Sequence, residues 1–246
     1  MQPFSYADAP VPVREDLTDA HRRAWQNLAR PGNWWTGAER VAIADELRAA
    51  SSCQLCRERK AALKPNAASG SHDTVSELPD PAIEAIHRIT SDPARLTRTW
   101  FDELATAGLD DGHYVELLGV VVCVLSIDAF HRALGVVLEP LPRPEPGEPS
   151  RRRPEGLAPE GAWLPMIRPE RLGEAERGLY GRSAMSANVI RAMSLVPDAV
   201  RELLSLSAAQ YLAIERMQSM ETNRALDRPQ MELLAGRVSA LNECFY

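Results

Sequence analysis

The sequence predicts an all-α protein, and three observations on its 246 residues support this fold class. Apolar residues recur at the spacing of an amphipathic helix along most of the chain, whereas the alternation typical of strands is nearly absent. Helix-capping residues and glycines bound these stretches. Nine of the thirty residues from Pro140 to Pro169 are prolines, a density that no helix tolerates. We therefore expect two related helical units, residues 1–139 and 170–246, joined by an extended Pro-rich linker over residues 140–169.

Local signals place the individual helices. Thr36 is a good N-cap, Asp110 or Asp111 caps the longest helix, and Gly135 ends it. The helices expected in the first unit cover residues 14–28, 37–50, 52–60, 81–90, 93–107 and 112–134, with a polar loop over 66–79. In the second unit helical patterning resumes near residue 188, and three residues break it into short helices: Pro197, Ser207 and Asp227.

Composition narrows the function classes. The net charge of −6 argues against nucleic acid as a partner, because phosphate binding needs clustered cations. The most apolar run, from Leu117 to Ile127, has eleven uncharged residues, well short of the ~20 that span a bilayer, so we expect a buried helix and no membrane partner. The first ten residues lack the features of a signal peptide, and four cysteines without an export signal indicate cytoplasmic thiols.

Cys53 and Cys56 form a C-x-x-C motif at an expected helix start. The helix dipole, with Arg57 and Lys60 one turn from the sulfurs, favours thiolates there, and a close second thiol allows a disulfide to form. We expect an exposed redox pair with no metal and no cofactor. Two alternatives stay open: two packed residues without chemistry, or half of a zinc site completed by histidines among His72, His87 and His113. Cys123, within the apolar run, is expected to be inert.

An internal repeat relates the two units. Thr36 lies seventeen residues before Cys53, and Asp227 lies seventeen residues before Cys244. Both intervals begin with a good N-cap and contain one amphipathic helix. Glu232 lies on the second of these helices, where a carboxylate before a cysteine could accept a proton from a thiol.

From Glu232 to Cys244 the chain resembles the alkylhydroperoxidase D / carboxymuconolactone decarboxylase-like family, in which eleven residues separate a glutamate from a C-x-x-C-x-x-x-H motif. The resemblance implies a helical bundle, Glu232 as the relay carboxylate and Cys244 as the first redox cysteine. The second cysteine and the histidine would fall beyond Tyr246, so we expect the second unit to be incomplete. In the first unit Val41 stands at the glutamate position and Lys60 at the histidine position.

Two residues of the longest helix, Glu116 and His131, could supply the proton acceptor that Cys53 and Cys56 lack. On this basis we expect a thiol-dependent peroxidase-like or disulfide-exchange protein, which takes a hydroperoxide as substrate and a dithiol as reductant. The alternative is a degenerate family member that serves as an oligomeric scaffold or binds a small molecule. Lactone decarboxylation, the other chemistry of the family, does not use a cysteine pair. An apolar face on the last helix also predicts a homo-oligomer.

Overall fold

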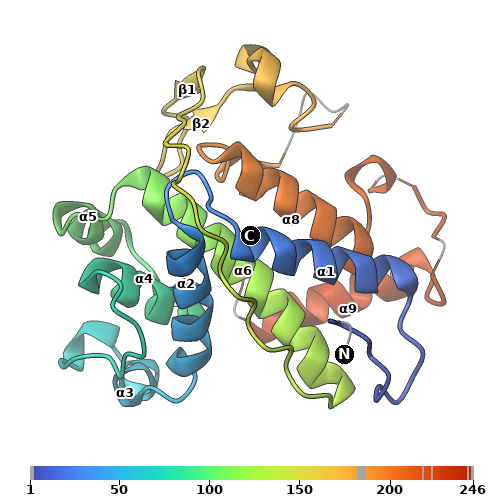
Figure 1. Ribbon diagram of the computed structural model, residues 1–246, viewed down its shortest axis with the longest axis horizontal. Helices are drawn as coiled ribbons and strands as arrows, with labels where there is room; N and C mark the ends of the chain where they lie inside the picture. The colour runs from blue at the N-terminus through green and yellow to red at the C-terminus, as the bar shows by residue number, and fades with distance from the viewer. Residues whose placement is uncertain (1–2, 182–186, 218, 223, 243, 245–246) are drawn as a thin grey trace.

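The computed structural model describes residues 3–181, 187–217, 219–222, 224–242 and 244, and its regular structure is almost entirely helical (Figure 1). Phe245 and Tyr246, which belong to the family-like segment, lie outside the described residues. The α-helices, in chain order, are α1 (Glu15–Ala29), α2 (Gly37–Ala50), α3 (Gln54–Ala61), α4 (Asp80–Ser91), α5 (Arg98–Thr106), α6 (Asp111–Leu134), α7 (Asn188–Arg191), α8 (Pro197–Gln210) and α9 (Arg228–Leu241).

Helix α6 is the centre of the bundle, with α2, α4 and α8 packed against it. Its length and apolar composition would suit a membrane span, but eleven of its twenty-four residues are buried in the protein, and the helix packs against α2, α4 and α8. It also carries three buried polar groups, Glu116, Asp128 and His131. Asp128 is fully buried and accepts two hydrogen bonds from Arg48 of α2, at 2.9 and 2.7 Å. This bidentate pair fixes α2 on α6.

The helix ends follow the local signals. Thr36 and Glu39 form a capping box at the start of α2, Asp110 accepts a hydrogen bond from the backbone of His113, and Gly135 ends α6 with φ +68°. Two predicted boundaries were wrong. The helix expected over 93–107 is split, because Thr97 is extended and caps α5, leaving a 3-10 turn at Pro93–Arg95. Ser207 does not end a helix, since α8 continues to Gln210.

Residues 135–156 form an extended strap that runs back along the bundle from the end of α6, seen in yellow-green in Figure 1. The strap binds the α1–α2 corner through its backbone: the N–H groups of Glu145, Ser150 and Arg151 donate to the carbonyls of Ala29, Gly32 and Asn33. Beyond it, inside the predicted linker, β1 (Leu157–Ala158) and β2 (Met166–Ile167) form a short antiparallel pair.

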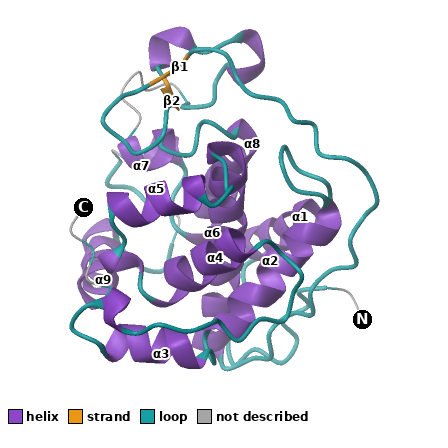
Figure 2. Ribbon diagram, turned by 90° about the vertical axis from the view of Figure 1, so that its left-hand side faces the viewer, coloured by secondary structure: helices purple, strands orange, loops and turns teal. Residues whose placement is uncertain are grey.

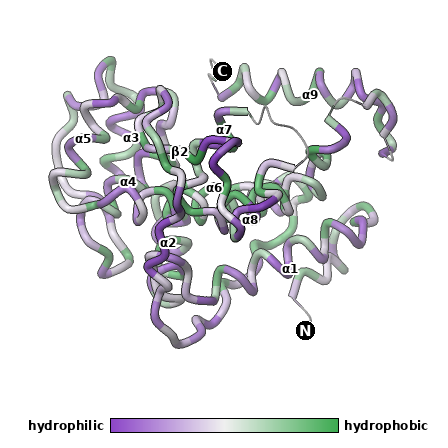
Figure 3. Tube along the Cα trace, turned by 90° about the horizontal axis from the view of Figure 1, so that it is seen from above, coloured by the Kyte–Doolittle hydropathy of each residue, from purple (hydrophilic) through white to green (hydrophobic). Residues whose placement is uncertain are grey.

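The chain beyond the linker divides into a packed part and an exposed part. Helix α8 packs on α1 and α6, and its residues Val200 and Leu206 belong to the same apolar cluster as Leu117 and Val121 of α6. Helix α9 has no buried residue and lies apart from the bundle (Figure 3). The division into two separate units stays a prediction. Helix α8 of the expected second unit shares one apolar core with the helices of the first.

Candidate metal centre

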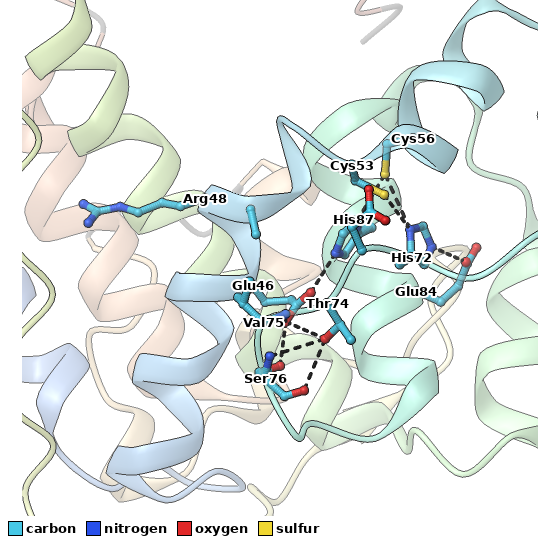
Figure 4. Close-up of polar contacts among 12 residues, drawn as sticks. Glu46, Arg48, Cys53, Cys56, His72, Thr74, Val75, Ser76, Glu84 and His87 are labelled. Atoms are coloured by element: carbon cyan, nitrogen blue, oxygen red, sulfur yellow. Dashed lines mark hydrogen bonds and ion pairs between the residues drawn. The ribbon is translucent and has the colours of Figure 1, made fainter.

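Four side chains from three parts of the chain converge beside α3. Cys53 is the N-cap residue of α3 and Cys56 lies in its first turn, His87 projects from α4, and His72 lies in the loop between these helices. Their Sγ and Nδ1 atoms all lie within 4.8 Å of one another (Figure 4). Zinc commonly has two thiolates and two imidazoles as its ligands.

The separations suit a single ion. The Nδ1 atom of His72 lies 3.5 Å from Cys53 Sγ and 3.6 Å from Cys56 Sγ, and the Nδ1 atom of His87 lies 3.2 Å from Cys56 Sγ. A tetrahedral zinc with ordinary bond lengths separates sulfur from nitrogen by about 3.5 Å. The four atoms are therefore close to the corners of a zinc coordination sphere.

Each imidazole is oriented by a carboxylate on its far side. The Nε2 atom of His87 lies 2.8 Å from Glu46 Oε1, and the Nε2 atom of His72 lies 2.8 Å from Glu84 Oε2. A carboxylate accepts a hydrogen bond from an N–H, so these contacts keep an N–H at Nε2 and turn Nδ1 of each ring toward the sulfurs. Metal-bound histidines generally make this second hydrogen bond.

The two carboxylates are themselves held in place. Glu46 Oε2 accepts hydrogen bonds from the Thr74 and Ser76 hydroxyls and the Val75 amide, at 3.0, 2.6 and 3.1 Å. Glu84 pairs with Arg59 at 2.8 Å and accepts from the Trp100 indole at 3.1 Å. The Glu46 contacts attach the His72 loop to α2. The Arg59–Glu84 pair attaches α3 to α4.

Electrostatics favour the thiolate of Cys56 and the protonated forms of His72 and His87. Burial opposes ionisation of Cys56, but hydrogen bonds with His72, His87 and Ser91 outweigh it and lower the thiol pKa to about 6. Burial likewise opposes protonation of His72, yet Cys56, Glu84 and Cys53 raise its pKa to about 10. The pKa of Glu84 falls to about 2 despite burial, because His72 and Arg59 stabilise the carboxylate. The site thus stabilises a thiolate beside cations.

The expectation of exposed thiols was wrong. Cys53 is 0% and Cys56 2% exposed, because the loop carrying His72 folds over α3. The two sulfurs are nevertheless neighbours, since both contact the same imidazole nitrogen. Cys123 is half-buried, and burial raises the pKa of its thiol to about 12; its expected inertness stays a prediction.

The other predicted site residues have partners elsewhere. Glu116 accepts hydrogen bonds from Arg40 and from the Trp34 amide. His131 contacts the Ile127 carbonyl and lies among aromatic rings. On the exposed helix α9, Glu232 binds Tyr211 and Arg228. Cys244 is exposed.

Sequence reasoning named His72 and His87 only as alternatives and missed both carboxylates. The available signal was the spacing C-x₂-C-x₁₅-H-x₁₄-H, whereas Glu84 gave none, because its partner His72 lies in a loop twelve residues earlier. Glu46 gave no local signal, because its role depends on how α2 packs against α4.

Comparison with known proteins adds no further assignment. No protein family model, no curated protein and no solved structure matches this chain.

Proposed function

We propose that Cys53, Cys56, His72 and His87 bind one Zn²⁺ ion, and that this ion holds the α3 region of the protein in place. The observation that carries the proposal is the convergence of four donor atoms within 4.8 Å, with the second nitrogen of each imidazole on a carboxylate. Two thiolates neutralise the charge of the ion, and the two glutamates strengthen the imidazoles as ligands.

The donor set favours zinc over other common metals. Magnesium and calcium prefer oxygen ligands, whereas a tetrahedral set of two sulfurs and two nitrogens is typical of zinc. Four protein ligands leave no open position for water or substrate, which is the arrangement of a structural rather than a catalytic zinc.

The packing of α3 supports a structural role. This eight-residue helix buries only Leu55 and Cys56, and with Cys53 they form an apolar cluster separate from the main core. A helix of this length is marginal by itself in water. A metal ion would link it to α4 through His87 and to the following loop through His72, and binding energy would then become folding energy.

Metal analysis of the purified protein tests the proposal. We expect one zinc per chain, and less than about a tenth of that content in Cys56→Ser and His87→Gln. Cys123→Ser is the matched control, because it removes a thiol outside the cluster, and it should keep its zinc. Far-UV circular dichroism establishes that each variant is folded. A wild-type protein that contains no zinc and binds none when zinc is added would contradict the proposal.

A second candidate function uses the same sulfurs for redox chemistry. Cys53 and Cys56 are neighbours, and Cys56, His87 and Glu46 form a line of contacts at 3.2 and 2.8 Å, which supplies the proton acceptor missing from the sequence motif. One thiolate would attack a hydroperoxide and the other would close the disulfide: two thiols and ROOH give a disulfide, ROH and water. A dithiol would then reduce the disulfide.

Peroxide consumption separates the two functions. A redox enzyme would turn over a hydroperoxide with dithiothreitol and lose activity in both Cys53→Ser and Cys56→Ser. A structural zinc protein would show no turnover, with or without bound zinc.

Three further expectations from the sequence remain proposals: the resemblance to the alkylhydroperoxidase D-like family, cytoplasmic location and homo-oligomer formation. Helix α9 supports the last of these with four apolar side chains that are 55–75% exposed: Leu233, Leu234, Val238 and Leu241.

A further inference from the structure

A cavity of about 370 Å³ lies beside Cys56, and neither histidine of the cluster is among its lining residues. The cavity is bounded by α2, α3, α4 and α6, and the Cys56 residue contributes to its wall. Three cations line it, Arg57, Lys60 and Arg132, and no aspartate or glutamate is among its lining residues. This local charge is opposite in sign to the net charge of the chain, which is −6.

Few carboxylates of the described residues neutralise the positive charge of these three cations. Across the described residues, no carboxylate lies within ion-pair distance of Lys60 or Arg57. Arg132 lies 3.9 Å from Asp128, but both oxygens of that carboxylate are already bound by Arg48 at 2.7–2.9 Å. Three positive charges around one cavity therefore lack an anion of their own.

The rest of the wall gives the cavity a mixed character. Leu47, Ala50 and Leu125 make one side apolar. The hydroxyl of Thr90, which also lines the cavity, is buried and has no hydrogen-bond partner among the described residues. Ser51, Thr90 and Ser91 add polar side chains to this wall.

We propose that this cavity binds a small organic carboxylate with a short apolar chain, seated against Cys56. The cations would pair with the carboxylate, and the apolar chain would lie on Leu47 and Leu125. The site stands on the cavity itself, so it holds whether or not the neighbouring cluster carries a metal. If the redox function also holds, carboxylate-bearing hydroperoxides become its substrate class.

Alkylation of the cysteines tests proximity to Cys56. Iodoacetate and iodoacetamide react alike: the sulfur bonds to the CH₂ carbon and iodide leaves. Only iodoacetate carries a carboxylate. We expect the iodoacetate/iodoacetamide rate ratio at Cys56, measured by mass spectrometry on the purified protein, to exceed the ratio at exposed Cys244 at least fivefold. The ratio cancels any general change in thiol reactivity.

Variants show whether the cations cause the preference. In a Lys60→Gln, Arg132→Gln double variant the ratio at Cys56 should fall to that at Cys244, whereas Arg30→Gln, which removes an exposed cation lining a different cavity, should leave it unchanged. In a second arm, hexanoate but not hexanol should raise the melting temperature of the wild type, and neither should raise that of the double variant. Equal ratios at the two cysteines, together with no hexanoate-specific shift, overturn the proposal, as does a preference that survives in the double variant. Because a zinc-bound thiolate alkylates slowly, the alkylation arm is carried out on protein whose zinc has been removed with a chelator, whereas the hexanoate arm needs no free thiol.

Discussion

At the scale of single residues, the distinctive feature of the chain is that buried histidines differ in the groups that surround them. His72 and His87 each lie between a sulfur and a carboxylate, which favours their protonated form in the absence of metal. His21 is equally buried, but it lies against Phe4, Tyr6 and Phe130, and neither ring nitrogen contacts a carboxylate among the described residues. The same side chain thus has opposite acid–base behaviour at the two places.

The carboxylate of Glu84, which contacts His72, is expected to raise the zinc affinity of the proposed site. Replacing Glu84 by glutamine keeps a hydrogen-bond acceptor but removes the charge, so zinc affinity should fall about 10- to 100-fold. Competition with a chromophoric chelator measures the change. Glu58→Gln, which alters an exposed glutamate of α3, is the control and should bind zinc as the wild type does. Equal affinities for all three proteins would show that Glu84 does not tune the site.

His21 predicts an acid-sensitive stability. Burial, with a smaller contribution from the charge of His131, lowers its pKa from 6.5 to about 4 in the folded protein. Between these values the unfolded chain binds more protons, so stability is complete above pH 6.5 and is lost as the pH falls toward 4. The loss is about 2 kcal/mol at pH 5.

Urea unfolding at pH 7 and pH 5 measures this loss. His21→Gln has no titrating group at this position, so its free energy of unfolding should fall less than that of the wild type between the two pH values, by about 2 kcal/mol. The effects of all other groups, the metal cluster included, cancel in this difference. Parallel pH curves for the two proteins would exclude His21 as the cause.

At the scale of helices, α3 and the loop after it depend on the cluster more than on apolar packing. Figure 2 shows α3 at the edge of the molecule. Arg95 adds a polar attachment, since its guanidinium donates to the carbonyls of Ala62, Arg59 and Lys60 at the end of α3, at 2.7–3.1 Å. The cluster and the Arg59–Glu84 ion pair link α3 to α4, and Arg95 links the end of α3 to the turn that follows α4.

Removal of the metal should therefore loosen one segment only. After chelation we expect faster backbone hydrogen exchange in residues 53–79, while the core of α6 keeps its protection. Mass spectrometry of peptides from both regions measures this. A uniform increase along the chain would instead indicate global unfolding, and unchanged exchange in residues 53–79 would argue against a structural ion.

The Arg48–Asp128 pair between α2 and α6 is expected to raise the free energy of unfolding of the whole protein. Arg48→Ala leaves the fully buried carboxylate of Asp128 without its main partner, which should lower the free energy of unfolding by about 3–5 kcal/mol. Arg98→Ala breaks an ion pair whose side chains are about 55% exposed and should cost less than about 1 kcal/mol. Comparable losses in the two variants would mean that the Arg48 pair contributes no more than a surface pair.

The same scale shows what the sequence could predict. Caps and periodicity act within a few residues of one another, so the ends of α2 and α6 and the buried position of α6 were predictable. The cluster was not, because Glu46, His72 and His87 meet only after α2, α4 and a loop have packed. The C-x-x-C motif identified where chemistry would occur, but burial of the thiols depended on a loop whose path no local rule fixes.

At the scale of the whole molecule, the two helices of the predicted repeat, α2 and α9, are alike in length and capping but differ in burial. Helices α2 and α9 have the same length of fourteen residues and both begin with a capping box, as the matched spacing predicted. Yet α2 is packed at the centre, whereas α9 buries none of its residues. Local sequence therefore specified the two helices alike, and tertiary contacts made them different.

The exposed face of α9 predicts concentration-dependent association. Leu234, Val238 and Leu241 recur at helical spacing on one face, and a partner chain would cover them. Sedimentation velocity should show a dimer or larger species for the full chain and a monomer for a chain ending before Arg228. Because α9 has no buried residue, the shortened chain should keep its urea midpoint. A full chain that stays monomeric at high concentration would contradict this prediction.

The strap over residues 135–156 has a consequence for the order in which the molecule assembles. Its hydrogen bonds go to carbonyls at the corner between α1 and α2, more than a hundred residues earlier in the chain. That corner exists only once those two helices have met, so docking of the strap is expected to follow the collapse of the helices rather than guide it. Helix α8, which comes after the strap, would then reach its place on α1 and α6 among the last steps, and it closes a core that earlier stages leave open to water.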